Sequence, residues 1–266
     1  MKNSLKAEFK KLLTVRTTYF ISLFFLVLVG FLAFYVDGFK NSPPETLGAL
    51  GQAKATLFIA GNLTQTASII SVAGGFIGLL LLAHEYRYGT IIYTLSASTS
   101  RTKVLLSKII AVLVFTLVYS AIATTIAVVL MKAGASASGH SLPAQDVNYL
   151  TYVAKSVYYA EGFALGGLLF AALIRNQIGA FAALFIIPNP VEGILSLLLK
   201  HDSVYLPFTA LQQVIQPPAI RGVTAAHADT AVSGVLSAPK GGLVFACYLV
   251  AAWLVAWYLF LRRDAA

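Results

Sequence analysis

Residues 108–131 have the sequence KIIAVLVFTLVYSAIATTIAVVLM, in which a single lysine precedes an unbroken run without any charge. A helix needs about 20 apolar residues to cross the hydrocarbon core of a bilayer. A helix also satisfies its own backbone hydrogen bonds, which lipid does not do. This stretch therefore predicts a transmembrane helix.

Five further segments have the same apolar character, and only the fifth of the six is interrupted, by Pro188-Asn189-Pro190. Apolar residues make up 58% of the 266 residues and charged residues 11%, and the mean hydropathy is +0.80. A soluble domain needs more charge to cover its surface. We predict an all-α membrane protein forming a single transmembrane domain over residues 1–266, with six transmembrane helices at 17–36, 66–83, 108–131, 149–173, 178–199 and 242–261.

The net charge of +9 lies at the ends of these segments and not on one face, which argues against a nucleic-acid partner. With the N-terminus inside, twelve lysines and arginines fall on the cytoplasmic side and seven on the other. Basic residues favour the inner side, so we predict that both termini are cytoplasmic. The segment 17–36 is too long for a signal peptide and lacks a convincing cleavage site after it.

Residues 2–16 predict an amphipathic helix that lies on the inner membrane surface as an interfacial helix. Such helices contact lipid through their apolar face and anionic headgroups through their lysines. A role as a simple topology anchor is compatible with this one. The apolar face has Leu5, Phe9, Leu12 and Leu13, and the opposite face has Lys2, Lys6 and Lys10.

Three polar stretches are expected to be external loops. Residues 37–65 are polar and turn-rich, and residues 132–148 form a short loop. Residues 200–241 form the longest loop, broken by Pro217, Pro218 and Gly222, and the stretch 204–215 is compatible with a short helix lying at the outer surface.

The cytoplasmic segment 84–107 is the most informative. Glu85 and Arg87 end the second span, and Gly89 is able to break the helix there. Ser98, Thr99 or Ser100 is suited to cap the next helix. A short helix between two spans suits transmission of a push from a soluble partner, although an ordinary positively charged inner loop fits the same spacing.

Three motifs carry a resemblance to a known family. They are Glu85-Tyr86-Arg87-Tyr88-Gly89-Thr90 followed by Thr94-Leu95-Ser96 and Ser100-Arg101, the turn Leu173-Ile174-Arg175-Asn176-Gln177, and the external segment Tyr205-Leu206-Pro207-Phe208-Thr209-Ala210-Leu211. In order and spacing, the chain resembles the permease subunits of type-2 ABC exporters over almost its whole length. Many members have a second acidic residue where this chain has Arg87.

The resemblance implies the transmembrane subunit of an ABC exporter in a prokaryotic inner membrane, working with a cytoplasmic ABC ATP-binding subunit. Two such subunits would join two permease subunits, identical or homologous, with ATP and Mg²⁺ bound only on the partner. Residues 86–98 would form a coupling helix seated in the ATPase. The residues expected to couple the chain to the ATPase are Glu85, Tyr86, Arg87, Gly89, Thr90, Ser100 and Arg101, with Arg175, Asn176 and Gln177 as a secondary contact.

Two motifs imitate enzyme sites. His84-Glu85 begins like the zinc motif HExxH, but Tyr88 occupies the position of the second histidine. Residues 134–141 imitate a phosphate-binding loop, but His140 replaces its lysine and the segment is expected outside the cell. We therefore predict no metal, cofactor or catalytic site in this chain. An ATP-independent secondary transporter or channel is the alternative, although it predicts inverted repeats and paired intramembrane charges that are not evident.

Glu161 is the sharpest charge within a span, where ionisable groups usually face a partner or a wet cavity. It could line the transport path, pair with Lys155 or another span, or lie at the interface. Pro188, Pro190 and Glu192 are further candidates for the transport path.

Pro188, Pro190 and Glu192 interrupt the fifth span, which is expected to be either a re-entrant excursion or a kinked helix. Cys247 lies in the last span and is expected only to pack. Two pairs of glycines give small faces for close helix contact, namely Gly74 with Gly78 and Gly162 with Gly166.

Overall fold

The computed structural model describes residues 2–41, 49–96, 100–140, 148–216 and 236–262, and these are helical without any strand. The first elements are α1 (Lys2–Thr14), α2 (Arg16–Phe31) and the π-helical η1 (Leu32–Lys40), of which α2 and η1 form the first candidate span. The remaining elements are α3 (Ala49–Arg87), α4 (Ile91–Ser96), α5 (Arg101–Ala137), α6 (Tyr149–Ile174), α7 (Gln177–Ile186), η2 (Ile187–Val191), α8 (Glu192–Leu199), η3 (Lys200–Tyr205), α9 (Pro207–Ile215) and α10 (Ala238–Arg262).

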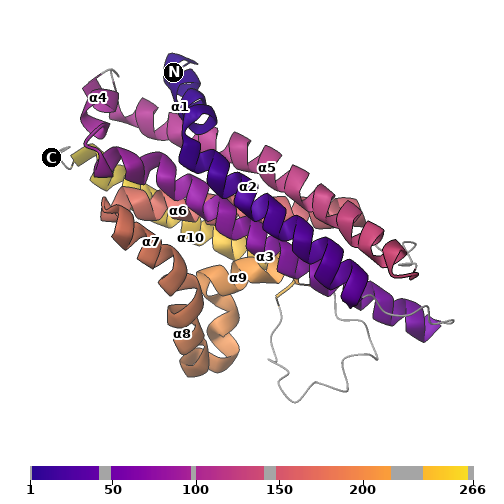
Figure 1. Cartoon of the computed structure of the whole chain (residues 1–266). Helices are drawn as coiled ribbons and strands as arrows, with labels where there is room; N and C mark the ends of the chain where they lie inside the picture. The colour runs from indigo at the N-terminus through magenta and orange to yellow at the C-terminus, as the bar shows by residue number, and fades with distance from the viewer. Residues whose placement is uncertain (1, 42–48, 97–99, 141–147, 217–235, 263–266) are drawn as a thin grey trace.

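Six of the described helical stretches are long and apolar enough to cross a membrane, which confirms the predicted number of apolar segments. They run roughly side by side, with α4 and both described ends of the chain near one end of the bundle (Figure 1). Each is longer than predicted, and their bounds are Arg16–Lys40, Phe58–Arg87, Arg101–Ala137, Tyr149–Ile174, Gln177–Tyr205 and Ala238–Arg262.

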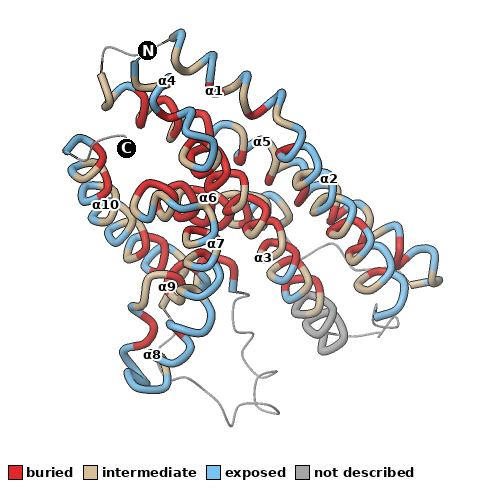
Figure 2. The backbone as a smooth tube through the Cα atoms, turned by 60° about the vertical axis from the view of Figure 1, so that its left-hand side comes forward, coloured by how far each residue is buried: buried red, intermediate tan, exposed pale blue. Residues whose placement is uncertain are grey.

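The centre of the bundle is the pair α3 and α6. In their most apolar windows 78% and 61% of the residues are buried, whereas the windows of α2 and α10 are each 17% buried. Buried residues accordingly concentrate along these two helices in Figure 2. A Cβ on Gly78 would lie 2.0 Å from the carbonyl oxygen of Ala164. The predicted use of Gly74 and Gly78 for close helix contact is therefore confirmed, because both face backbone atoms of α6.

The predicted loop at 37–65 is wrong over 37–40 and 49–65, which are helical, and its residues 42–48 lie outside the described residues. The first span continues as η1 to Lys40, and α3 already begins at Ala49. Ile59 and Leu63 on the additional turns of α3 are buried in an apolar cluster with residues of α2 and α5. Packing against neighbouring helices therefore extends α3 beyond the segment that hydropathy marks.

The predicted loop at 132–148 is also partly wrong, because α5 continues to Ala137. Gly134 of α5 packs on the backbone of η1, and a Cβ there would lie 2.1 Å from the carbonyl oxygen of Phe34. Gly38 of η1 makes the reciprocal contact with the carbonyl of Met131. Residues 141–147 of this loop lie outside the described residues.

Helix α7 continues through both prolines as the π-helical turn η2 and then as α8. The side chain of Asn189 donates to the carbonyl of Phe185 at 3.1 Å, which gives a partner to a carbonyl beside the interruption. The chain then reverses over η3 and returns as α9, and Figure 1 shows this excursion leaving the bundle. The structure therefore combines a proline-containing continuous helix with a return helix.

The short helix predicted at 204–215 is confirmed as α9, whereas Pro217, Pro218 and Gly222 lie outside the described residues. Cys247, which was expected to pack, is exposed on α10. Helix α10 lies at the edge of the bundle, so its positions alternate between the core and the outer surface.

Candidate coupling site

Helix α4 is a short helix between two of the longest helices in the structure. Gly89 has a φ of +66°, which turns the chain after α3 and confirms the predicted helix break. Ile91 is 4% exposed and anchors α4 in the core, whereas Ile92 is 53% and Tyr93 76% exposed. The helix therefore has one anchored face and one open face.

The first residue before α5 is Ser100, with extended backbone, but its side chain makes no capping hydrogen bond. The capping role predicted for Ser100 is wrong, and Ser98 and Thr99 lie outside the described residues. The helix expected over 86–98 begins later, because α3 continues to Arg87 and α4 begins at Ile91; its residues 97 and 98 lie outside the described residues.

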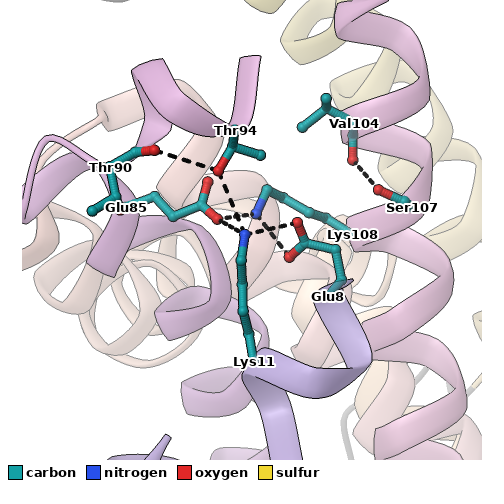
Figure 3. Close-up of polar contacts among 8 residues, drawn as sticks. All are labelled: Glu8, Lys11, Glu85, Thr90, Thr94, Val104, Ser107 and Lys108. Carbon is teal, nitrogen blue, oxygen red and sulfur yellow. Dashed lines mark hydrogen bonds and ion pairs between the residues drawn. The ribbon is translucent and has the colours of Figure 1, made fainter. Parts of the chain in front are cut away.

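Beside α4 lies a buried group of four charged side chains, which we call the charge cluster: Glu8, Lys11, Glu85 and Lys108 (Figure 3). The Lys108 Nζ lies 2.7 Å from Glu85 Oε1 and 3.0 Å from Glu8 Oε2. The Lys11 Nζ lies 3.0 Å from Glu8 Oε1 and 2.5 Å from Glu85 Oε1. The cluster thus joins α1, the end of α3 and the start of α5.

Three members of the charge cluster are almost fully buried. The side chains of Lys108, Glu8 and Glu85 are 0%, 2% and 6% exposed, and that of Lys11 is 36% exposed. Burying an unpaired ion is costly, and a buried ion is tolerated when it has close opposite charges. Each carboxylate here meets two ammonium groups. Because two carboxylates face two ammonium groups, the cluster as a whole has no net charge.

Lys11 is the member that also reaches α4, through a contact of 3.5 Å between its Nζ and Thr94 Oγ1. Burial acts against the charged form of Lys11, but the carboxylates of Glu85 and Glu8 outweigh it and raise its pKa. Lys11 is therefore an ammonium at every physiological pH.

The two predicted inner contact regions meet in the structure. Arg87 at the end of α3 donates from Nη1 to Gln177 Oε1 at the start of α7, at 3.3 Å. The guanidinium of Arg175 lies 5.7 Å from the ring centre of Tyr86. Asn176 caps α7 by accepting the backbone N–H of Gly179 at 3.0 Å. The turn between α6 and α7 is therefore fastened to the end of α3.

Arg101 and Thr90 lie at opposite ends of the α4 segment. Arg101 donates from Nη1 to the carbonyl oxygen of Leu261 at 3.3 Å, which joins the start of α5 to the end of α10. Thr90 is exposed, and its carbonyl accepts the backbone N–H of Thr94 at 3.2 Å. Polar contacts at this end of the bundle therefore join α1, α3, α4, α5, α7 and α10.

The candidates for the transport path lie apart from this end. Glu161 is near the middle of α6, where its Oε1 accepts from Thr116 of α5 at 2.9 Å and its Oε2 is buried without a partner among the described residues. Lys155 lies against the ring of Tyr152 instead, with its Nζ 5.6 Å from the ring centre. Pro188 and Pro190 both belong to η2.

Glu192 has a clear structural partner. Its carboxylate accepts the backbone N–H groups of Phe208 at 2.8 Å and Thr209 at 2.7 Å, and the Thr209 hydroxyl at 2.8 Å. These groups lie at the N-terminus of α9, where a negative charge is favourable. Glu192 therefore holds the excursion of α8 and α9 together.

Residues 4–189 match the family model described as ABC-2 family transporter protein, and this match covers well over half of the chain. The chain belongs to the ABC-2 family of transporter proteins. A comparison with curated proteins found no match. The matched residues include the whole charge cluster and α4, whereas α8, α9 and α10 lie beyond them.

Membership confirms the resemblance seen in the sequence and makes this ABC-2 protein a multi-pass membrane component of a transporter. Members of the family have no ATPase domain of their own and generally work with an ATP-binding subunit. Among the residues that the structure describes, no group of three His, Cys, Asp or Glu side chains is placed to hold a metal.

Three of the four members of the charge cluster were not among the site residues predicted from the sequence. Glu85 was singled out, but as a contact for the ATPase, whereas its carboxylate is buried against Lys11 and Lys108. A signal was present, because Lys108 lies inside the helical part of an apolar segment, where a charge requires a partner. Glu8 is also the only acidic residue before Asp37.

Proposed function

We propose that this ABC-2 protein is the transmembrane permease subunit of an exporter that is driven by ATP hydrolysed on a separate cytoplasmic subunit. The observation that carries the proposal is the open face of α4, where Ile92 and Tyr93 are exposed at a turn between two long helices. Aromatic residues on an exposed face are typical anchors of protein interfaces. We assign this face to the ATP-binding subunit.

A motion of α4 has a direct route into the bundle. Ile91 packs in the main apolar core, and Lys11 joins α4 to the charge cluster and so to α3 and α5. The contact between Arg87 and Gln177 offers a second route into α7. In this proposal Tyr86, Arg175 and Asn176 shape the same surface, while Glu85 acts from within the charge cluster.

We further propose an inner-membrane orientation with both termini in the cytoplasm. The distribution of lysines and arginines supports it, and both described ends of the chain lie near α4 (Figure 1). A second permease subunit, identical or homologous, would complete the transporter.

Glu161 is our candidate for the transport path, because one of its carboxylate oxygens is buried without a partner among the described residues. Pro188 and Pro190 would shape the path by placing α8 at an angle to α7. Glu192 would act on the path only through the position of α9.

The test is purification in mild detergent at native expression levels, followed by mass spectrometry for an ATP-binding subunit. We expect such a subunit to accompany the parent chain and to be lost from Tyr93→Ala. The control Tyr205→Ala removes a similarly exposed tyrosine from η3 and should retain the subunit.

Two outcomes would contradict the proposal. One is a parent chain that transports without nucleotide and without any ATP-binding subunit, which is the behaviour of a secondary transporter or channel. The other is equal retention of the subunit by Tyr93→Ala and Tyr205→Ala, which would place the docking surface elsewhere.

A second test measures whether ATP hydrolysis on the partner subunit is coupled to transport through this chain. Charge reversal in Arg87→Glu or Arg101→Glu should uncouple ATP hydrolysis from transport and leave membrane insertion intact, because both side chains make contacts between helix ends. Unchanged transport in both variants would remove the coupling role of these residues.

A further inference from the structure

A cavity of about 520 Å³ lies between the N-terminal helices α1 and α2 on one side and α3 and α4 on the other. Its size falls within the usual range for sites of small ligands, roughly 300–1,000 Å³. One part of its lining is apolar, with Leu12, Val15, Leu80 and Leu81. The other part is polar, with the charged side chains of Lys11 and Glu85 and with Thr18, His84 and Thr90.

The cavity lies at the level where two spanning helices have their ends. Thr18 is close to the start of Arg16–Lys40, and His84 is close to the end of Phe58–Arg87. Tyr88 lines the cavity and Tyr19 follows the lining residue Thr18; both rings are exposed, and tyrosines are typical of the membrane–water interface. A ligand at this depth meets hydrocarbon at one end and headgroups at the other.

The charge around the cavity favours an anion. Within the lining itself the charges of Lys11 and Glu85 offset each other, and Glu85 Oε2 is buried without a hydrogen-bond partner among the described residues. The exposed side chains of Lys6, Lys10 and Arg16 on the same N-terminal helices add positive charge. No further acidic residue occurs before Asp37. Basic residues near a membrane surface attract anionic lipids.

We propose that this cavity binds one anionic phospholipid, with an acyl chain over Leu80 and Leu81 and its phosphate at the exposed rim near Thr90, apart from the buried carboxylate of Glu85. A lipid tail needs no hydrogen bonds and therefore suits the leucine-lined part. A peptide segment from a partner would bring backbone N–H and C=O groups that leucines cannot satisfy.

The lipid would touch both walls of the cavity. Thr90, Tyr93 and Thr94 of the α4 segment line one wall, and Leu12 and Val15 line the other. The position of α4 against the bundle therefore depends on a bound lipid as well as on protein contacts. The proposed lipid site does not depend on the identity of the subunit that drives transport.

The experiment is native mass spectrometry of the full chain after addition of equal amounts of phosphatidylglycerol and phosphatidylcholine. We expect the parent to retain one phosphatidylglycerol in preference to phosphatidylcholine. Val15→Trp fills the cavity and should lower this occupancy at least tenfold. Lys10→Gln should lower it by about fivefold, the effect of one basic residue at a membrane surface.

Two further variants make the result decisive. Thr90→Trp blocks the cavity from its exposed rim without placing extra atoms in the protein core, and this variant should lose the lipid as Val15→Trp does. Lys240→Gln removes an exposed charge at the start of α10 and should retain the lipid. Gel filtration and circular dichroism show which variants are folded.

The proposal is overturned if both tryptophan variants retain as much phosphatidylglycerol as the parent, or if the parent retains the two lipids equally. It is also overturned if the tryptophan variants keep the lipid but lose an ATP-binding subunit, since the cavity would then hold a protein segment. Absence of any ATP-binding subunit from the parent, with the lipid bound as expected, counts against the proposed function alone.

Discussion

The close contact between α3 and α6 makes Gly78→Ala the sharpest test of the fold. Gly78 faces the backbone of α6, and an added Cβ would lie 2.0 Å from the Ala164 carbonyl oxygen and 2.8 Å from its carbonyl carbon. The obstacle is main chain on both sides, so no side chain is able to rotate out of the way.

The size of the effect follows from the distance. Ordinary van der Waals contact begins at 3.4 Å, so the two backbones must separate by about 1.4 Å at this point. Overpacking of a buried site typically costs about 1–3 kcal/mol, and occasionally more. Because α3 and α6 are both central, we expect a loss near the upper end, about 3 kcal/mol of unfolding free energy.

The assay is unfolding of the purified chain in mixed micelles with increasing mole fraction of dodecyl sulfate. Tryptophan fluorescence, which comes from Trp253 and Trp257 on α10, reports the transition, because Trp253 packs against the core. The matched control is Gly61→Ala in the same helix, because Gly61 is exposed and an added Cβ there meets nothing within 4 Å. That control should be unchanged or more stable by about 0.5–1 kcal/mol, the usual gain of alanine over glycine in a helix.

The reasoning is refuted if Gly78→Ala is as stable as Gly61→Ala. Such a result would mean that α3 and α6 are not in backbone contact at Ala164. A loss of stability in both variants would instead indicate a general effect on α3.

Three further predictions concern charged side chains. Lys108→Met should cost about 3–5 kcal/mol in the same unfolding assay, because it leaves buried carboxylates short of a partner, and a loss below about 1 kcal/mol would contradict the pairing. Glu192→Ala should cost about 1–2 kcal/mol through the lost cap of α9, which the same measurement checks against Asp202→Ala, an acidic residue in η3, as the control. Because the pKa of Lys11 is raised, the contribution of Lys11 to stability is fully present below the ordinary lysine value of 10.5 and is lost only as pH rises through the higher folded value. The difference in unfolding free energy between the parent and Lys11→Met should therefore stay constant from about pH 6 to 9. A difference that shrinks within this range would contradict the prediction.

Hydropathy predicted the spanning helices well because each of them needs enough apolar residues to cross the same thickness of lipid. It did not predict the helix ends, because these lie outside the hydrocarbon core and depend on contacts between helices. Helix α3 begins at Ala49 because Ile59 and Leu63 pack against neighbouring helices. Helix α5 continues to Ala137 because Gly134 fits against η1. Such contacts depend on residues distant in sequence, and a single-segment pattern does not contain them.

The candidate site was predicted in part for the same reason. Gly89 marked the turn before α4 because a glycine after a charged helix end is a local signal. The charge cluster unites residues from three helices, and each of its lysines has an ordinary role when it is considered alone, at a membrane edge or on an amphipathic helix. Glu192 similarly acquires its capping role only when the chain returns as α9.

The charge cluster also implies an order of assembly. Glu8 and Lys11 leave the ribosome first, but Glu85 and Lys108 follow only after two spans have been made. The newly made N-terminal segment must therefore wait at the bilayer surface until the third span delivers Lys108. In a chain that lacks its first dozen residues, Lys108 would reach a site in which one of its two carboxylate partners is missing. The truncation should therefore reduce correct membrane assembly, before any effect on transport is measured.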